Sequence, residues 1–203
     1  MRVIVLLIIF LNFSCLHMSM AEEKEAVVTD KYAHPIVEIK TGKGSMKFEL
    51  YEDKAPNTVA NFITLAESGF YKGQSFHRIS DDFLVQGGCP NTKPDGKGRF
   101  GSGGPGYTID EEPHKELKHK YGMLTMAKKR DKGTTGSQFC IFLDEAEYLD
   151  GKYTVFGKLI EGEDVLKKLA ALAGPRGKPK DYVPFNVIII SKNKTKYEVK
   201  KNK

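Results

Sequence analysis

Short apolar runs divided by glycine and proline dominate the chain from residue 36 to residue 190. Residues 36–41 and 44–51 alternate apolar with polar positions on either side of Gly42-Lys43, and this pattern predicts a β-hairpin. Six further runs of similar composition predict strands at 75–79, 84–87, 122–127, 138–143, 153–160 and 185–190. Many strands at this spacing in one domain can hide their edges by closing into a barrel.

Two segments have the apolar period of an amphipathic helix. The first begins at Pro56, which suits the first turn of a helix, and ends at Gly69. Its apolar stripe consists of Val59, Phe62, Ile63 and Ala66. The second runs from Glu163 to Ala173 and is ended by Gly174-Pro175. Two such helices can cap the open ends of a barrel, so the pattern predicts a mainly β fold with two helices.

The N-terminal residues have the layout of an export signal. Arg2 precedes nine apolar residues, a run too short to span a bilayer, and Ser19 and Ala21 are small residues at the −3 and −1 positions of a cleavage site. We therefore predict a signal peptide over residues 1–21 and export to the periplasm or the secretory pathway. The residues around Cys15 faintly resemble a lipoprotein processing site, which leaves lipid anchoring open as a second route.

Length and composition fit one folded domain better than two. Of the 203 residues, 40% are hydrophobic and 29% are charged, which is ordinary for a globular protein. The formal net charge of +6 is concentrated at the end of the chain, where residues 191–203 hold six lysines and one glutamate. We place a polar linker at 22–34, the domain at 35–191 and a basic, solvated and frayed tail at 192–203. The neutral body argues against nucleic acid as a partner.

Metal sites and activated nucleophiles need residue patterns that this sequence lacks. The five histidines have no His-x-x-x-His spacing and no Cys-x-x-Cys pair beside them, so we predict no metal. No Gly-x-Ser-x-Gly motif occurs, and Cys140 lies in an apolar run where a thiol is usually inert. Cys89 and Cys140 alone do not decide between a disulfide and two buried thiols.

Polar side chains within apolar strands need an explanation, because burying them without partners costs free energy. The residues concerned are Arg78, Gln86, Gln138 and the polar run 148–152 that leads into a strand. Each of them taken alone is more often a satisfied structural residue than a catalytic one.

Together, these segments resemble the cyclophilin family of peptidyl-prolyl cis-trans isomerases in their amino-acid sequence and in their order along the chain. The matching segments are Phe76-His77-Arg78-Ile79, Phe83-Leu84-Val85-Gln86-Gly87-Gly88, Gly101-Ser102-Gly103-Gly104, Gly136-Ser137-Gln138-Phe139, Leu149-Asp150-Gly151-Lys152 and Val155-Phe156-Gly157. The resemblance covers residues 35–191 and is nearest to the compact bacterial members. It implies a closed eight-stranded antiparallel β-barrel capped by two α-helices. It also implies rotation about X-Pro peptide bonds, without metal or cofactor, to assist the folding of exported proteins.

The resemblance makes Arg78 the catalytic arginine and Gln86 the residue that binds the substrate backbone and orients the arginine. An X-Pro bond resists rotation because the nitrogen lone pair is delocalised into the carbonyl, which gives a barrier of about 20 kcal/mol. A guanidinium aimed at that nitrogen localises the lone pair without transferring a proton.

The resemblance also implies the surfaces that hold a proline-containing segment of a client protein. An apolar pocket for the proline ring consists of Phe83, Leu84, Cys140, Leu149 and Tyr153. The residue before proline contacts the backbone of Lys128. The neighbouring groove is lined by Gly101, Ala127 and Gln138.

Four positions depart from the family pattern. Members commonly have phenylalanine at Cys140, tryptophan or another ring at Tyr148, histidine at Tyr153 and asparagine at Lys128. Tyr148 belongs to the implied substrate-binding set, and a phenol there places its donor differently from an indole N–H. We therefore predict only weak binding of cyclosporin-type inhibitors, and we expect a monomer.

The main alternative is a non-catalytic module, or a chaperone, that keeps the same barrel and only docks proline-containing segments. The joint presence of Arg78, Phe83 and Gln86 argues against this alternative.

Overall fold

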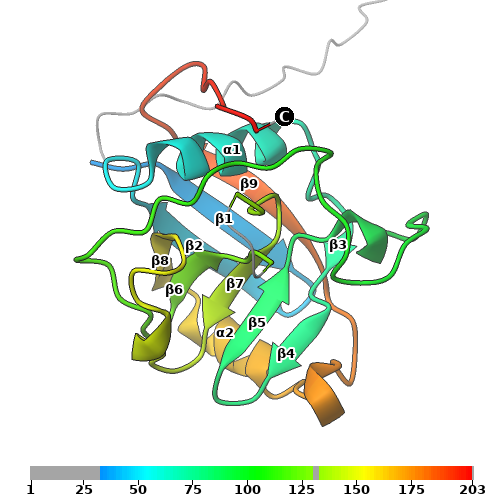
Figure 1. The fold of residues 1–203 in the computed structure, drawn as a ribbon. Coiled ribbons are helices and arrows are strands. Elements are labelled where there is room, and N and C mark those ends of the chain that lie inside the picture. The colour runs from blue at the N-terminus through cyan, green and yellow to red at the C-terminus, as the bar shows by residue number, and fades with distance from the viewer. Residues whose placement is uncertain (1–32, 130–132, 203) are drawn as a thin grey trace, which may run out of the picture.

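The computed structural model describes residues 33–129 and 133–202, which form a curled sheet with a helix at each end (Figure 1). The strands are β1 (Ile36–Thr41), β2 (Gly44–Leu50), β3 (Gln74–Ser75), β4 (Arg78–Ser80), β5 (Leu84–Gly87), β6 (Met123–Met126), β7 (Phe139–Phe142), β8 (Val155–Glu161) and β9 (Pro184–Ser191). The helices are α1 (Pro56–Glu67), α2 (Glu163–Ala170) and the short 3-10 helices η1 (Pro90–Thr92), η2 (Glu147–Leu149) and η3 (Pro175–Gly177).

The predicted signal peptide, Cys15 and most of the predicted linker lie outside the described residues. Among the residues that are described, the helices are all too short or too polar to cross a membrane.

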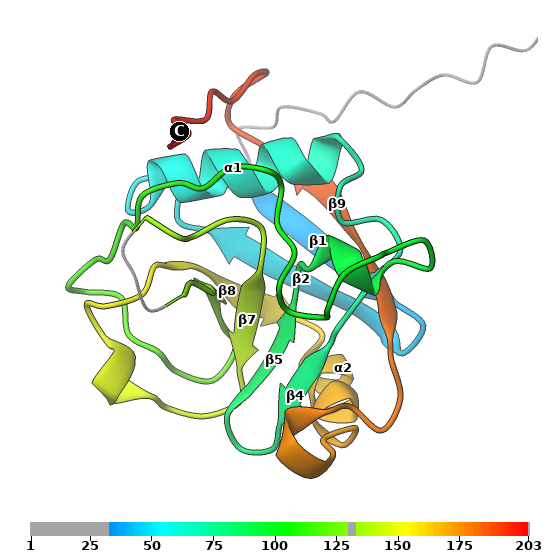
Figure 2. The same cartoon turned by 45° about the vertical axis from the view of Figure 1, so that its right-hand side comes forward.

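All paired strands are antiparallel, and the sheet order is β3-β9-β1-β2-β8-β6-β7-β5-β4. The predicted hairpin is β1–β2, in which Thr41 lies opposite Gly44. Along β2 the side chains of Met46, Phe48 and Leu50 are buried in strict alternation, as the pattern predicted. Figures 1 and 2 show β1, β2 and β9 behind β5 and β7, so the sheet wraps around a core.

One segment, which contains β3 and β4, joins the two ends of this sheet. β3 pairs with β9, whereas β4 pairs with β5. Between them, the backbone N–H of Phe76 donates to Val183 (3.2 Å) and that of His77 donates to Gln86 (3.0 Å). The predicted strand 75–79 is therefore two short strands, and the sheet has nine strands in place of the expected eight. The sheet is therefore closed by the chain segment that connects β3 to β4, because these two strands do not pair with each other.

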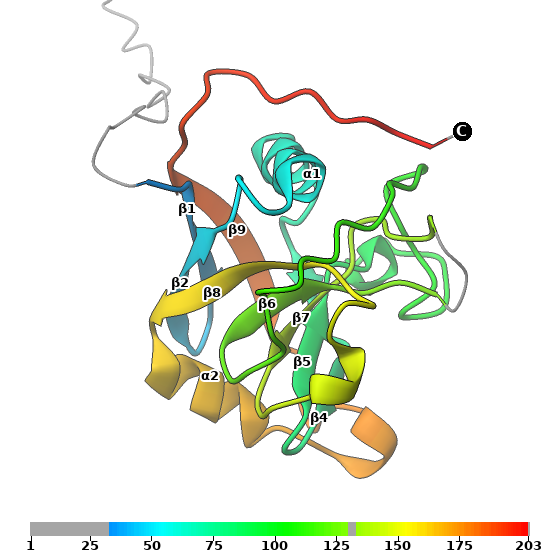
Figure 3. The same cartoon turned by 60° about the vertical axis from the view of Figure 1, so that its left-hand side comes forward.

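Helix α1 covers one end of the curled sheet (Figure 3). Its N-cap residue, Ala55, provides no side-chain hydrogen bond. Glu112 from a distant loop takes that role, because its carboxylate accepts the backbone N–H groups of Asn57 (3.0 Å) and Thr58 (2.7 Å). A carboxylate at this place satisfies unpaired donors and interacts favourably with the helix dipole. The helix is therefore tied to the loop that contains Glu112.

Helix α2 covers the opposite end of the sheet (Figure 3). Its buried residues are Val165, Leu166 and Leu169. Both predicted helices are confirmed, although α2 ends at Ala170 and α1 at Glu67, slightly before the predicted ends. Differences of this size are normal, because the last turn of a helix frays.

Aromatic rings fill the interior between α1 and the sheet. Phe62 of α1 contacts Tyr71, Phe139 and Phe156, with ring centroids 5.0, 5.5 and 5.2 Å apart. All four side chains are buried. The Tyr71 hydroxyl donates to the backbone carbonyl of Ser137 (3.1 Å), so this buried donor has its partner.

The C-terminal tail is not the frayed end that its charge predicts. Lys192 is buried and its ammonium pairs with Glu67 of α1, and Tyr197 is buried within the hydrophobic core cluster. From there the chain runs over α1 toward a loop on the far side (Figure 3). The lysine count misled the prediction, because Lys194 and its neighbours keep their charges exposed while Tyr197 and Val199 pack inward.

Candidate functional site

An open pocket lies on the outer face of strands β5, β6 and β7. It is lined by Arg78, Phe83, Leu84, Gln86, Thr125, Met126, Ala127, Lys128, Cys140, Phe142, Leu149 and Tyr153. We call it the apolar pocket. Alternate residues of a strand share a face, and the register places Leu84 opposite Phe142 and Gln86 opposite Cys140. The pocket therefore follows directly from the pairing of β5 with β7.

Arg78 lies at the rim of the apolar pocket. It is exposed, and its guanidinium carbon lies 5.8 Å from the centroid of the Phe83 ring. Behind it, a Cβ added to Gly177 would lie 3.3 Å from Arg78 Cγ, so η3 packs closely against the arginine stem. Arg78 forms no ion pair with any residue in the described parts of the chain. Its donors are therefore available to a ligand in the pocket.

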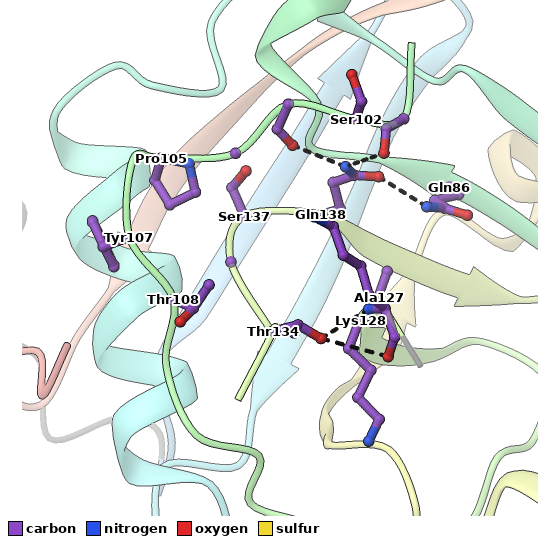
Figure 4. Close-up of a pocket in the computed structure, with 15 residues that line it drawn as sticks. Gln86, Ser102, Pro105, Tyr107, Thr108, Ala127, Lys128, Thr134, Ser137 and Gln138 are labelled. Atoms are coloured by element: carbon purple, nitrogen blue, oxygen red, sulfur yellow. Dashed lines mark hydrogen bonds between the residues drawn. The ribbon is translucent and has the colours of Figure 1, made fainter. Parts of the chain in front are cut away.

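The side-chain amides of Gln86 and Gln138 form a hydrogen-bonded relay (Figure 4), and Gln86 lies opposite Arg78 in the pairing of β4 with β5. Gln138 Nε2 donates to the backbone carbonyls of Gly101 (2.8 Å) and Gly103 (2.9 Å). These two acceptors set the orientation of the Gln138 amide, and its Oε1 then accepts from Gln86 Nε2 at 3.0 Å. Gln86 thus has its Oε1 left as an acceptor. Among the described residues the Gln86 amide is held by Gln138, and it makes no hydrogen bond to Arg78.

A second pocket adjoins the first and shares Gln86, Ala127 and Lys128 with it (Figure 4). Its other lining residues are Gly101, Ser102, Gly103, Gly104, Pro105, Tyr107, Thr108, Lys129, Thr134, Gly136, Ser137 and Gln138. We call it the upstream pocket. The glycine-rich stretch 101–104 therefore forms one wall of the upstream pocket.

Burial determines the charge of two titratable groups beside Arg78. The pKa of His77 is lowered to about 4 by burial and, to a smaller extent, by the positive charge of Arg78. Its Nδ1 is buried without a partner in the described structure, which suits a neutral ring. Burial raises the pKa of Cys140 to about 12, although Arg78 opposes the shift. At neutral pH both groups are uncharged, and Cys140 is a protonated and inert thiol.

The cysteine question left open by the sequence is settled in favour of free thiols. Cys89 and Cys140 are both buried and unpaired. Cys89 Sγ accepts the backbone N–H groups of Gly101 (3.3 Å) and Gly103 (3.4 Å), so it supports the same loop that holds Gln138.

Tyr148 is placed outside both pockets. The residue is 64% exposed, and its ring stacks on that of Phe83 with centroids 6.5 Å apart. The loop that carries it is held by Asp150, which accepts the backbone N–H of His119 (2.9 Å) and contacts His119 Nδ1 (2.8 Å). Tyr148 therefore extends the apolar surface beyond Phe83 and does not enclose it.

The described parts of the chain contain no group of three or more His, Cys, Asp or Glu side chains that could hold a metal ion. At the apolar pocket, the exposed Arg78 guanidinium and the Gln86 amide offer hydrogen-bonding groups next to apolar side chains.

Comparison with known proteins assigns the chain to a family. Residues 36–194 match the family profile described as "Cyclophilin type peptidyl-prolyl cis-trans isomerase/CLD". The chain belongs to this cyclophilin family. It is therefore a peptidyl-prolyl cis-trans isomerase.

Individual relatives show how far the similarity extends. A peptidyl-prolyl cis-trans isomerase of Helicobacter pylori is 46% identical over 134 residues, which are 64% of this chain and 77% of that protein. Peptidyl-prolyl cis-trans isomerase B of Bacillus subtilis is 45% identical over 129 residues, which are 62% of this chain and 82% of that protein. The Cryptosporidium parvum cyclophilin structure has a TM-score of 0.70 and 35% identity, and it covers 77% of this chain and 97% of its own. A second structure of that protein was determined in the presence of the dipeptide Ala-Pro.

The structure brings almost all of the predicted site residues together. Residues in the apolar pocket are Arg78, Phe83, Leu84, Gln86, Ala127, Lys128, Cys140, Leu149 and Tyr153, and the upstream pocket adds Gly101 and Gln138. Tyr148 is the exception. Sequence reasoning missed Thr125, Met126 and Phe142 as lining residues. Cross-strand pairing could have found Thr125 and Phe142, because Thr125 lies opposite Cys140 and Phe142 lies two residues along β7 on the same face as Cys140. Met126 follows Thr125 and belongs to the core cluster, so this rule does not identify it.

Three of the four departures from the cyclophilin pattern, Cys140, Tyr153 and Lys128, line the apolar pocket. Cys140 is smaller than the phenylalanine common in the family, and Phe142, two positions along β7, lines the same pocket. Tyr153 replaces a histidine, and the ammonium of Lys128 lies 5.2 Å from the centroid of its ring. This contact joins two of the departures into one cation–π pair at the pocket rim.

We predict that His77 makes the stability of the protein depend on pH. Its folded pKa is depressed to about 4, below the ordinary value of 6.5, so its contribution is present above pH 6.5. The contribution is lost as the pH falls from 6.5 through 4, because the unfolded chain binds the proton first. Between pH 7 and pH 4, the melting temperature of a His77→Gln variant should therefore fall less than that of the wild type. Equal falls would show that His77 does not titrate below its ordinary value.

Proposed function

We propose that Arg78 catalyses rotation about X-Pro bonds in proline-containing segments of client proteins that fold after export. The observation that carries this proposal is an exposed guanidinium beside an apolar pocket, with no acidic partner among the described residues. A structural arginine would have a carboxylate or backbone carbonyls to satisfy it.

The pocket suits a proline ring, and the rim suits the peptide around it. Phe83, Leu84, Phe142 and Leu149 offer apolar contacts, while Gln86 Oε1 offers an acceptor for a substrate N–H. With the ring held in the pocket, the Arg78 guanidinium can donate to the proline nitrogen as its lone pair localises. Proton transfer is not required, so the neutral state of His77 and Cys140 fits the reaction.

The energy that this arrangement must supply is modest. Uncatalysed isomerisation takes about 10 to 100 s, so a turnover near 10² s⁻¹ requires about 5.5 kcal/mol of selective stabilisation. One or two charge-assisted hydrogen bonds in a partly dry site are worth about 2 to 4 kcal/mol each in the transition state. Arg78 and the substrate contacts of Gln86 are therefore sufficient in magnitude.

A docking module without catalysis would use the same apolar pocket. It would have no use for an unpaired arginine held by Gly177 on one side and Phe83 on the other. The glutamine relay adds to this argument, because it aligns an acceptor beside the arginine at the cost of ordering two side chains. A catalytic role for Arg78 is therefore better supported than a role in docking alone.

The remaining parts of the proposal concern the whole protein. We propose a monomer that is exported by its N-terminal signal, with lipid attachment at Cys15 as the alternative route. The exposure of Tyr148 supports weak binding of cyclosporin-type inhibitors, since this residue lines neither pocket.

We predict that Arg78→Ala lowers kcat/KM about 30- to 1000-fold on X-Pro peptides while the melting temperature changes little. This range corresponds to the loss of about 2 to 4 kcal/mol of transition-state stabilisation. Arg78→Lys keeps the charge but loses the planar fork, so it should recover only part of the rate. Arg99→Ala, at an exposed arginine outside both pockets, serves as the matched control. A wild-type rate in Arg78→Ala, or a loss of about 3 to 5 kcal/mol of stability, would contradict the catalytic role.

We predict that the exported protein begins at Glu22. The expected mass, measured on protein purified from cells that make the full chain, is that of residues 22–203. An intact Met1 would contradict export by this signal, and a lipid-modified Cys15 would replace the soluble form with an anchored one.

A further inference from the structure

The last residues of the tail are attached at defined points to helix α1. The backbone N–H of Lys200 donates to Asn57 Oδ1 (2.8 Å), and Asn57 Nδ2 donates back to the carbonyl of Lys200 (3.0 Å). Just before this point, Val199 packs against the hydrophobic core and Tyr197 is buried. A reciprocal pair of bonds next to an apolar anchor fixes both the position and the direction of the chain end.

Beyond Lys200 the chain pairs with the loop that carries the upstream pocket. The backbone N–H of Asn202 donates to the carbonyl of Thr108 (2.8 Å), in an antiparallel bridge between the two residues. Asn202 Nδ2 donates to Asp110 Oδ1 (3.0 Å). The ammonium of Lys201 lies 4.2 Å from the centroid of the Tyr107 ring. Three of the four loop positions 107–110 are therefore held by the two tail residues Lys201 and Asn202.

The inner side of the same loop forms the wall of the upstream pocket. Tyr107 and Thr108 both line it. The Tyr107 hydroxyl donates to Asn61 Oδ1 (2.7 Å), and Asn61 Nδ2 donates to the carbonyl of Gly136 (2.8 Å), which also lines the pocket. Ile109 pairs with Thr135 next to it. The loop is thus a thin partition with the tail on one side and the pocket on the other.

We propose that Lys201 and Asn202 are positioning residues that hold the Tyr107–Thr108 wall of the upstream pocket and so determine how well it accepts the substrate side chain upstream of proline. They contact no substrate themselves. With the proline ring in the apolar pocket and the preceding residue at the backbone of Lys128, the chain before it enters the upstream pocket, since Lys128 lines both.

The tail residues that touch the loop lie outside the part of the chain that matches the family profile. The cyclophilin profile ends at residue 194, before the tail residues that touch the loop. Other parts of the tail are bound elsewhere, because Lys194 pairs with Glu52 at 2.6 Å, on a residue that lines neither pocket. The attachment at Lys200–Asn202 is therefore the part of the tail that can act on the upstream pocket.

The test uses the mature protein and two proline peptides. A short blocked Ala-Pro peptide fills only the apolar pocket, whereas a longer peptide adds a phenylalanine two residues before proline. A Lys201→Ala/Asn202→Ala variant should lose about 3- to 10-fold in kcat/KM on the longer peptide, mainly through KM, and less than 2-fold on the short one. Lys194→Ala, at the other end of the tail, should leave both values unchanged.

Exchanging the amide of Asn202 with the carboxylate of Asp110 separates the positioning role from a general effect on stability. Asn202→Asp places a carboxylate against that of Asp110. It should therefore lower kcat/KM on the longer peptide at least as much as Asn202→Ala does. Combining Asn202→Asp with Asp110→Asn restores the donor–acceptor pair and should restore the affinity.

The inference rests on the isomerase activity, and the short peptide measures that activity separately. A variant in which kcat/KM falls equally on both peptides, or falls on neither, contradicts the positioning role. An Asn202→Asp/Asp110→Asn variant that does not recover kcat/KM on the longer peptide contradicts it as well. If the double alanine variant does not fold, the Asn202→Ala variant and the swap decide the outcome.

Discussion

The closure of the sheet by a single short segment is the constraint on which the site depends. Phe76, within this segment, is buried and stacks on Phe185 of β9 with ring centroids 4.6 Å apart. A Cβ at Gly87 of β5 would lie 2.9 Å from Phe185 and 3.0 Å from Phe76, so only glycine allows the two ends of the sheet to meet over these rings. Phe76 and Ile79 both point into the core, three residues apart, which breaks the alternation of a regular strand. That break leaves Arg78 on the outside.

The register carries this arrangement across the sheet to the other site residues. Arg78 lies opposite Gln86, and Gln86 lies opposite Cys140 on β7. Gln138 precedes β7 and reaches the carbonyls of Gly101 and Gly103. The position of Arg78 at the rim, the apolar pocket and the upstream pocket therefore all result from two strand pairings and one held loop. A change at any of these positions alters the geometry of the next one.

Most of the fold and of the site could be predicted from the sequence, because both depend on local patterns. Alternation along β2 and the helical stripe around Phe62 identify buried faces without knowledge of their partners. Ordered motifs placed Arg78 and Gln86 in one site. The division of the predicted strand at His77 could not be predicted, since it results from pairing with two distant strands. The hydrogen bond from Gln86 to Gln138 could not be predicted either. It depends on the carbonyls of a loop whose path cannot be derived from the apolar pattern of the sequence.

The tail shows the limit of arguments from charge. Its lysines predict solvation correctly for most of their ammonium groups, yet Tyr197 and Val199 pack the tail against the hydrophobic core. Two apolar side chains among six lysines carry no recognisable period, so the sequence offers no signal for this contact. The attachment becomes visible only when α1 and the Thr108 loop are brought together in the folded chain.

The most direct test of the account is an NMR titration of the isotopically labelled mature protein with an Ala-Pro peptide. The account predicts that the Arg78 Nε–H and Gln86 side-chain amide resonances shift and broaden together with the backbone signals of Phe83 and Leu149, as the peptide exchanges between its cis and trans forms. Unchanged Arg78 and Gln86 signals, with shifts centred on another surface, would contradict it.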